Sequence, residues 1–156
     1  MQTPVTQQLE KNNIPYQFFQ HPGKVRSLEQ AATERGQRPE QIVRSIVFRL
    51  SKDEFLMVLM AGPRQISWSK LRRYLGQSRV TMASEEEVFS ATGYPLGAVS
   101  PLGLPVPMRI LVDQSVLNEE IISMGSGVRS TTIILRSEDL VKALGEVEIG
   151  SFCQDC

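Results

Sequence analysis

Apolar residues follow two different periods along the chain, and these predict both helices and strands. Val5 and Leu9 lie four residues apart in a polar segment, which is the spacing of an amphipathic helix. The segments 42–50 and 54–61 are instead nearly continuous runs of apolar and β-branched residues, and the polar link at 51–53 predicts a β-hairpin. Further strands are expected at 16–20, 79–82, 108–112, 120–124 and 131–135.

Capping residues and glycines set the expected ends of the helices. A serine before a helix accepts a hydrogen bond from a free backbone N–H, and a glycine after it adopts the left-handed conformation that stops the helix. These signals predict helices at 3–12, 27–35, 67–75 and 137–144, a short turn after Pro39 and a further helix after Ser84, with Ser27, Ser67, Ser84 and Ser137 as N-caps.

The order of these elements predicts the fold class. Helices and strands mix without the regular strand–helix–strand repeat of a parallel α/β fold. The 156 residues contain no repeat and no linker long enough to separate two domains. We therefore expect one α+β domain over 1–156, built around a mixed, curved sheet flanked by helices, with residues 145–156 as a tail.

Composition is close to the average for globular proteins, with 41% apolar and 22% charged residues. The longest apolar run, 55–61, is far shorter than the roughly 20 residues that span a bilayer. The polar start of the chain lacks the cationic and apolar regions of a signal peptide. A soluble, cytoplasmic protein without a membrane partner is expected.

Histidine and cysteine usage excludes several chemistries. His21 is the single histidine, and the two cysteines, Cys153 and Cys156, lie at the end of the chain. A zinc site with interior cysteine and histidine ligands is therefore excluded, and a Ser-His-Asp triad would depend on His21 alone. No phosphate-binding glycine motif is present. We expect neither metal nor organic cofactor, and interpret the C-x-x-C spacing as a frayed end carrying two thiols.

Charge is unevenly distributed although the net charge is zero. Residues 1–79 hold 13 Lys and Arg against 6 Asp and Glu, whereas residues 80–156 hold 4 against 11. Such a distribution suits an anionic partner, and the candidate contacts for nucleic-acid phosphates are Arg64, Lys70, Arg72 and Arg73. The alternative, that the two halves interleave in space and their fields cancel, remains open.

Two glycine-containing loops are candidate binding elements. The first, 97–103, combines Gly97 with Ser100 and Pro101, and the second is Gly125-Ser126-Gly127. Glycine lets a backbone approach a ligand closely, and exposed backbone amides can bind an oxygen atom. The alternative, which composition alone favours, is that both loops are simply tight turns between strands. Arg44, inside an apolar strand, either faces solvent or lies at a pocket mouth as a phosphate ligand.

These segments together resemble the YbaK and prolyl-tRNA-synthetase-associated domain family. The resemblance extends from about Val5 to Leu144 and includes a G-x-x-x-P signature at 97–101. Its parts are Ile14-Pro15-Tyr16 with His21-Pro22, then 42–48, Trp68-Ser69-Lys70-Leu71 with Leu75-Gly76, Thr92-Gly93-Tyr94, 97–103, 125–129 and 137–140.

The resemblance implies a mixed sheet curled into a partial barrel and a trans-editing deacylase. Its substrate would be the ester between a small, wrong amino acid and the 3′-terminal adenosine of tRNA-Pro or a related tRNA. The partners implied are the tRNA acceptor end and an aminoacyl-tRNA synthetase. Such an ester is already activated, so a site that orients water needs no strong base. A catalytically inactive module that binds tRNA or aminoacyl-adenosine is the alternative.

The resemblance also implies roles for individual residues. Arg44 would anchor the terminal phosphate or ribose, although the family usually has lysine at this position. Gly97, Ser100 and Pro101 would shape the aminoacyl pocket. The remaining substrate-binding candidates are Phe19, His21, Ser45, Gly125, Ser126 and Gly127.

Overall fold

The computed structural model describes residues 2–156 and confirms the α+β class. Its α-helices are α1 (Pro4–Lys11), α2 (Leu28–Arg35), α3 (Trp68–Leu75), α4 (Glu85–Thr92) and α5 (Ser137–Leu144), with short 3-10 turns at Pro39–Gln41 and Gln114–Asn118. Its strands are β1 (Gln17–Gln20), β2 (Val43–Ser51), β3 (Glu54–Ala61), β4 (Thr81–Met82), β5 (Arg109–Asp113), β6 (Ile121–Gly125), β7 (Thr131–Arg136) and β8 (Glu148–Gly150).

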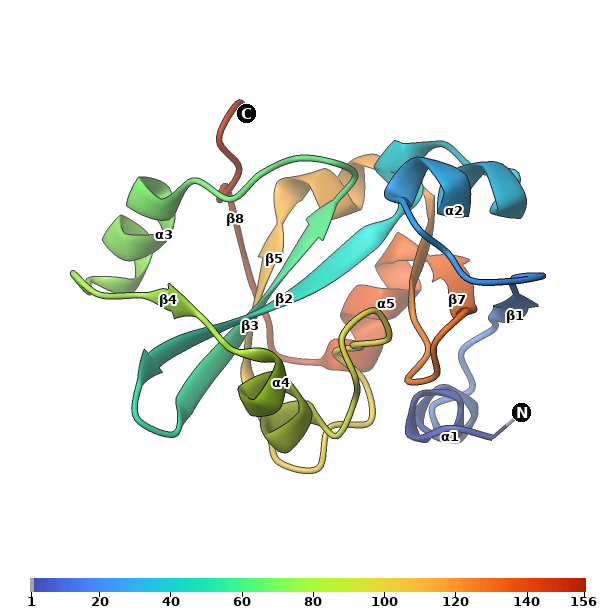
Figure 1. Cartoon of the computed structure of the whole chain (residues 1–156), viewed down its shortest axis with the longest axis horizontal. Coiled ribbons are helices and arrows are strands. Elements are labelled where there is room, and N and C mark those ends of the chain that lie inside the picture. The colour runs from blue at the N-terminus through green and yellow to red at the C-terminus, as the bar shows by residue number, and fades with distance from the viewer. Residues whose placement is uncertain (1) are drawn as a thin grey trace.

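The strands form two sheets that are not closed into a barrel (Figure 1). One sheet is antiparallel in the order β1-β7-β6, and the other is mixed in the order β4-β2-β3-β5-β8. The predicted hairpin is present as β2 and β3. A bridge between Ile42 and Ser123 connects the two sheets, so the start of β2 lies beside β6.

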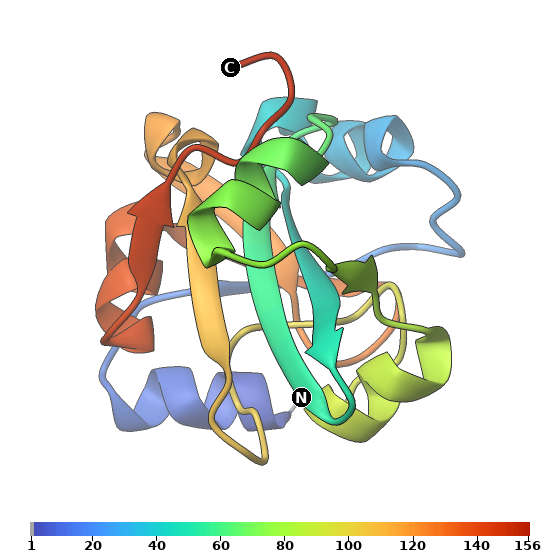
Figure 2. The ribbon, with the colours of Figure 1, turned by 90° about the vertical axis from the view of Figure 1, so that its left-hand side faces the viewer.

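The five-stranded sheet is covered on both faces. Along β3, the side chains of Met57 and Leu59 belong to the main core, whereas those of Val58 and Met60 pack with Leu71 of α3 in a second cluster. Figure 2 shows α3 lying across that second face. Side chains also alternate between the two faces along β2, so only every second one can reach the main core.

Three of the four predicted helix caps are confirmed. The hydroxyls of Ser27, Ser67 and Ser84 each accept a hydrogen bond from the backbone N–H three residues later. The prediction for Ser137 was wrong, because α5 already begins at this residue and Arg136 occupies the N-cap. The Ser137 hydroxyl instead donates to the carbonyl of Glu119 at 2.6 Å, which ties α5 to the segment just before β6.

The end of the chain differs from the predicted tail. Strand β8 pairs in parallel with β5, and Phe152 is fully buried in the second cluster. The backbone N–H of Phe152 donates to the buried carboxylate of Asp113 at 2.7 Å. Burial of the Phe152 ring in this cluster holds the segment in place. The local sequence does not reveal this effect, because the ring packs against residues far away in the chain. Across the described residues, no helix has the length and hydropathy needed to cross a membrane.

Candidate functional site

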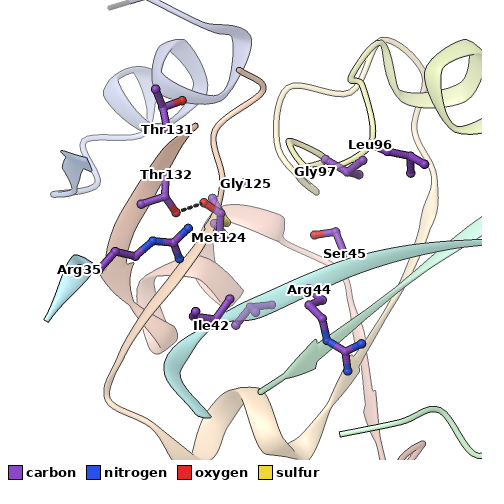
Figure 3. A pocket seen from close by; sticks show the side chains of 12 residues that line it. Arg35, Ile42, Arg44, Ser45, Leu96, Gly97, Met124, Gly125, Thr131 and Thr132 are labelled. Carbon is purple, nitrogen blue, oxygen red and sulfur yellow. Dashed lines mark hydrogen bonds between the residues drawn. The ribbon is translucent and has the colours of Figure 1, made fainter. Parts of the chain in front are cut away.

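A cavity of about 240 Å³ lies where the start of β2, the loop after α4 and the β6–β7 connection meet (Figure 3). Of the predicted site residues, Arg44, Ser45, Gly97 and Gly125 border it. The two glycine-containing loops and the β2 strand, which are far apart in sequence, are therefore brought together. The end of α2 contributes Arg35, which the sequence analysis did not identify.

The two glycine-containing loops pack directly against each other. The N–H of Gly127 donates to the carbonyl of Ala98 at 3.0 Å. A Cβ atom placed on Gly125 would lie 2.2 Å from the carbonyl oxygen of Val99, well inside van der Waals contact. Gly125 thus permits a close backbone approach, as expected, but the backbone that approaches it belongs to the other loop and not to a ligand. The Gly127 amide is consequently not free to bind a ligand.

The hydroxyls of Ser100 and Ser126 form hydrogen bonds with nearby residues of their own loops. Ser100 is fully buried, and its Oγ accepts from the N–H of Leu102 at 3.1 Å. Ser126 is also buried, and its Oγ contacts Thr131 and accepts from the N–H of Val128. Neither serine lines the cavity, and neither does Pro101. These residues support the cavity wall without presenting a polar group to its interior.

Tyr94 holds the first loop from behind. Its hydroxyl donates to the carbonyl of Leu102 at 2.7 Å, and burial raises the pKa of Tyr94 to about 12. The ring also lies against Gly127, where a Cβ atom would come within 2.9 Å of it. One buried tyrosine therefore contacts both glycine-containing loops and fixes their relative position.

Arg44 borders the cavity, but its guanidinium points away from it (Figure 3). Arg44 is paired with Met60 in the hairpin, on the face covered by α3. Its Nε donates to the carbonyl of Gly62 at 2.9 Å, and Nη2 donates to the carbonyl of Arg64. Partial burial lowers the pKa of Arg44. The predicted phosphate role does not fit this geometry, because strand alternation turns the side chain to the other face.

Ser45, a predicted substrate contact, lines the cavity. It is paired with Leu59 on the main-core face, and Figure 3 shows its hydroxyl directed into the space between β2 and the loops that carry Gly97 and Gly125. The Oγ atom is buried and has no hydrogen-bond partner among the described residues. Burying a hydroxyl without a hydrogen-bond partner costs free energy, and a ligand that supplies the partner recovers it. Ser45 is therefore available to bind a polar group.

Arg35 is the cation whose guanidinium faces this region (Figure 3). Its Nε donates to Nε2 of His21 at 3.0 Å, and Nη1 donates to Oγ of Ser123 at 2.7 Å. Burial lowers the pKa of Arg35 to about 10, so the side chain stays protonated at neutral pH. From the sequence, Arg35 is one cation at the end of a polar helix, and its hydrogen bonds to His21 and to Ser123 of β6 hold it beside the cavity.

His21 holds Arg35 in place and does not itself line the cavity. The ring is buried, and Nδ1 lies 2.6 Å from the carboxylate of Glu34. Because Nε2 accepts from Arg35, the ring proton belongs on Nδ1, and neither nitrogen is free to act as a general base. Hydrogen bonds from Gln30 and His21 lower the pKa of Glu34. The predicted rim residue Phe19 packs edge-on against the imidazole, 4.9 Å between ring centroids.

The candidate phosphate contacts Lys70, Arg72 and Arg73 lie on α3, which covers the second face of the five-stranded sheet (Figure 2). Ser45, which lines the cavity, lies on the main-core face of that sheet. Arg73 is exposed and Arg72 half-buried, and neither forms an ion pair with another described residue. Lys70 is engaged, because its Nζ donates to the carbonyl of Cys153 at 2.8 Å. Elsewhere the two oppositely charged halves of the chain do interleave, as in the pairs Arg38–Glu119 and Arg49–Glu87. The charges of Arg72 and Arg73 are therefore not paired with an acidic side chain of residues 2–156.

The polar side chains around the cavity favour binding and orientation over acid–base chemistry. They are Arg35, Arg44, Ser45, Thr131 and Thr132, and within residues 2–156 no carboxylate, histidine or cysteine lines this cavity. The Thr132 hydroxyl is engaged by the carbonyl of Met124 at 2.7 Å. Such a site can hold an anion and a polar group next to apolar surface, and it suits a substrate whose bond is already activated.

Known proteins resemble this chain both in sequence and in fold. Residues 22–143 match the family described as the aminoacyl-tRNA editing domain. A proline–tRNA ligase of Kosmotoga olearia is 35% identical over 100 residues, which cover 64% of this chain and 17% of that enzyme. One from Thermosipho africanus is 36% identical over 92 residues, covering 59% and 16%. The chain therefore matches only a small part of these much longer relatives.

Two solved structures share the whole fold. One is described as a proposed trans-editing enzyme for prolyl-tRNA synthetase, with a TM-score of 0.86, 23% identity and coverage of 99% of both chains. The other is a hypothetical protein with a TM-score of 0.88, 22% identity and coverage of 97% of this chain and all of that one. Because the family match spans most of the sequence and the fold agrees over nearly its whole length, the chain belongs to the aminoacyl-tRNA editing domain family, as its YbaK-like motifs predicted.

Proposed function

We propose that this protein hydrolyses, in trans, the ester bond of a mischarged aminoacyl-tRNA that carries a small amino acid, on tRNA-Pro or a related tRNA. The family match supports editing as the general function. The observation that carries the proposal is the unpartnered Ser45 hydroxyl. It faces a cavity that Arg35 also lines and to which no described residue contributes a strong base. Such a site binds and orients an activated ester.

Each part of the substrate has a suitable place in this cavity. Arg35 would bind a phosphate oxygen of the terminal nucleotide, because its guanidinium is charged and fixed by His21 and Ser123. Ser45 would bind a polar group of the aminoacyl moiety. Water would attack the ester carbonyl with assistance from the neighbouring ribose hydroxyl and the α-amino group, while the site holds the reacting atoms in line.

The size and lining of the cavity favour a small amino acid. Its volume is about 240 Å³, and Val43, Val99 and Met124 supply apolar walls. Part of this space must accommodate the ribose, so a large aromatic side chain would not fit beside it. A bulky substrate would have to displace the packed loops, which Gly125 and Tyr94 hold together.

The direct test is a deacylation assay on a panel of mischarged tRNAs, beside measurements of binding to the same tRNAs. We expect hydrolysis of esters of small amino acids, with bulky esters spared. Binding without hydrolysis of any ester would favour the inactive binding module. A requirement for added prolyl-tRNA synthetase would identify the synthetase as a partner.

Ser45→Ala should weaken catalysis without weakening the fold. A single hydrogen bond to substrate contributes about 1 kcal/mol, so kcat/KM should fall roughly five-fold. The melting temperature should stay unchanged or rise, because the hydroxyl has no partner in the free protein. Ser78→Ala, at an exposed loop position, is the matched control. Unchanged kcat/KM in Ser45→Ala would show that this hydroxyl does not contact the substrate.

The basic segment, with Arg64, Lys70, Arg72 and Arg73, is proposed to contact tRNA phosphates. Replacing Arg72 and Arg73 by glutamine should weaken tRNA binding and flatten the slope of log affinity against log salt by roughly one unit per lost phosphate contact. Lys142→Gln, an exposed cation on α5, should leave the slope unchanged. If the double variant keeps the wild-type slope, tRNA binds to another surface.

A further inference from the structure

The two cysteines at the end of the chain form a disulfide beside a buried carboxylate. Cys153 is 1% exposed, whereas Cys156 is exposed. The sulfur atoms of both cysteines and a carboxylate oxygen of Asp113 all lie within 4.8 Å of one another. This places a buried carboxylate near both sulfur atoms. The proposed editing function uses none of these groups.

The backbone holds Cys153 much more firmly than Cys156. Before Cys153, the Phe152 carbonyl accepts from the N–H of Ser67 at 2.8 Å, and after it the Gln154 N–H donates to the Gln65 carbonyl at 2.8 Å. At Cys156, the recorded hydrogen bond is the one its carbonyl accepts from Lys70 at 3.4 Å. Cys153 would therefore stay in place when the disulfide opens, whereas Cys156 would be free to react.

A second cavity, of about 290 Å³, lies next to this disulfide. Its lining includes Cys153, Arg64 and the carboxylates of Glu40 and Asp155. The Oε2 atom of Glu40 is buried and has no hydrogen-bond partner among the described residues. A cation beside carboxylates suits a ligand that carries both a carboxylate and an ammonium group. The unpartnered Glu40 oxygen would accept a hydrogen bond from the ammonium group.

We propose that Cys153 and Cys156 form a reversible redox site that exchanges with a small zwitterionic disulfide bound next to Arg64 and Glu40. Cys156 first loses its thiol proton to solvent, and the resulting thiolate attacks one sulfur of the disulfide RSSR, which releases one RS⁻ and leaves a mixed disulfide. Cys153 then transfers its proton to Asp113 and attacks the Cys156 sulfur, which releases the second RS⁻. Two electrons pass from the protein dithiol to RSSR, and the two protons end on the released thiols.

Redox exchange fits these residues better than metal binding. Among the residues that the structure describes, three ligating side chains meet here, and structural zinc sites normally use four. Both carboxylate oxygens of Asp113 already accept backbone hydrogen bonds, from Phe152 at 2.7 Å and from Ser115 at 3.0 Å. Bound zinc would therefore be an outcome against the proposal.

The test uses glutathione as the probe and counts thiols by alkylation and intact mass. The reduced protein, incubated with oxidised glutathione, should lose both free thiols and form the internal disulfide. Cys153→Ser should instead accumulate a mixed disulfide at Cys156, because the resolving thiol is missing. Cys156→Ser should be alkylated several-fold more slowly than Cys153→Ser, because its remaining thiol is buried.

Two further variants test the small-molecule site. Arg64→Ala and Glu40→Gln should slow exchange with oxidised glutathione while leaving exchange with the uncharged hydroxyethyl disulfide unchanged. Lys142→Gln, which lies outside this cavity, should affect neither reaction.

Several results would overturn the proposal. These are persistence of both thiols in excess oxidised glutathione, equal alkylation rates in the two cysteine variants, and stoichiometric zinc released by a chelator. Equal rates for charged and uncharged disulfides in every variant would refute the zwitterion site. Because these measurements count thiols and involve no tRNA, they succeed or fail independently of the proposed deacylase function.

Discussion

Replacing Arg35 by methionine should lower kcat/KM for deacylation about 100-fold, the usual cost of removing a charged group that orients a reacting substrate. Arg35 is protonated at neutral pH, since its pKa is about 10, and its guanidinium is fixed by hydrogen bonds to His21 and Ser123. Methionine retains similar length and apolar packing but cannot bind an anion. The measurement is single-turnover deacylation of a substrate identified in the panel, with the melting temperature recorded in parallel.

Arg44→Met provides the matched control for this prediction. The Arg44 guanidinium binds the carbonyls of Gly62 and Arg64 on the α3 face, so its loss should lower stability by about 1–2 kcal/mol and change the rate far less than Arg35→Met does. Arg44→Lys should recover part of that stability. The opposite ranking, with Arg44→Met inactive and Arg35→Met active, would assign the anion contact to Arg44, as the family resemblance implied.

Gly125→Val should both destabilise the protein, by about 2–4 kcal/mol, and abolish deacylation. A Cβ atom at this position would lie 2.2 Å from the carbonyl oxygen of Val99 and 2.9 Å from that of Ala98. Neither backbone can move without separating the loops that wall the cavity, so the added side chain would disrupt the fold and the site together. Thermal unfolding and the deacylation rate measure the two effects.

Gly97→Ala separates the steric clash expected in Gly125→Val from the cost of placing a residue other than glycine in the left-handed conformation. Gly97 has φ +88°, but a Cβ atom there would meet no other atom within 4 Å. Alanine should therefore cost only about 1–2 kcal/mol, from the left-handed backbone alone, and should retain measurable activity. If Gly125→Val is no less stable than Gly97→Ala, the close packing of the two loops does not hold in solution.

Local signals in the sequence determined most of the secondary structure. The β2–β3 hairpin follows from two apolar runs with a polar link, and the helices after Ser27 and Ser67 begin at their caps and end at Gly36 and Gly76. These features depend on residues a few positions apart, so the sequence displays them directly. The motifs around the two glycine-containing loops also identified the family correctly.

The tertiary structure decided which side chains form the site. Residues 42–48 are apolar on both faces of the strand, so their pattern does not reveal which face meets the cavity, and pairing with β3 places Ser45 there with the Arg44 guanidinium turned away. Arg35 is held beside the cavity by hydrogen bonds to His21 and Ser123, which lie far from it in the sequence. Phe152 orders the predicted tail by filling a distant core cluster. Each of these outcomes depends on contacts between segments far apart in the chain, which local propensity does not encode.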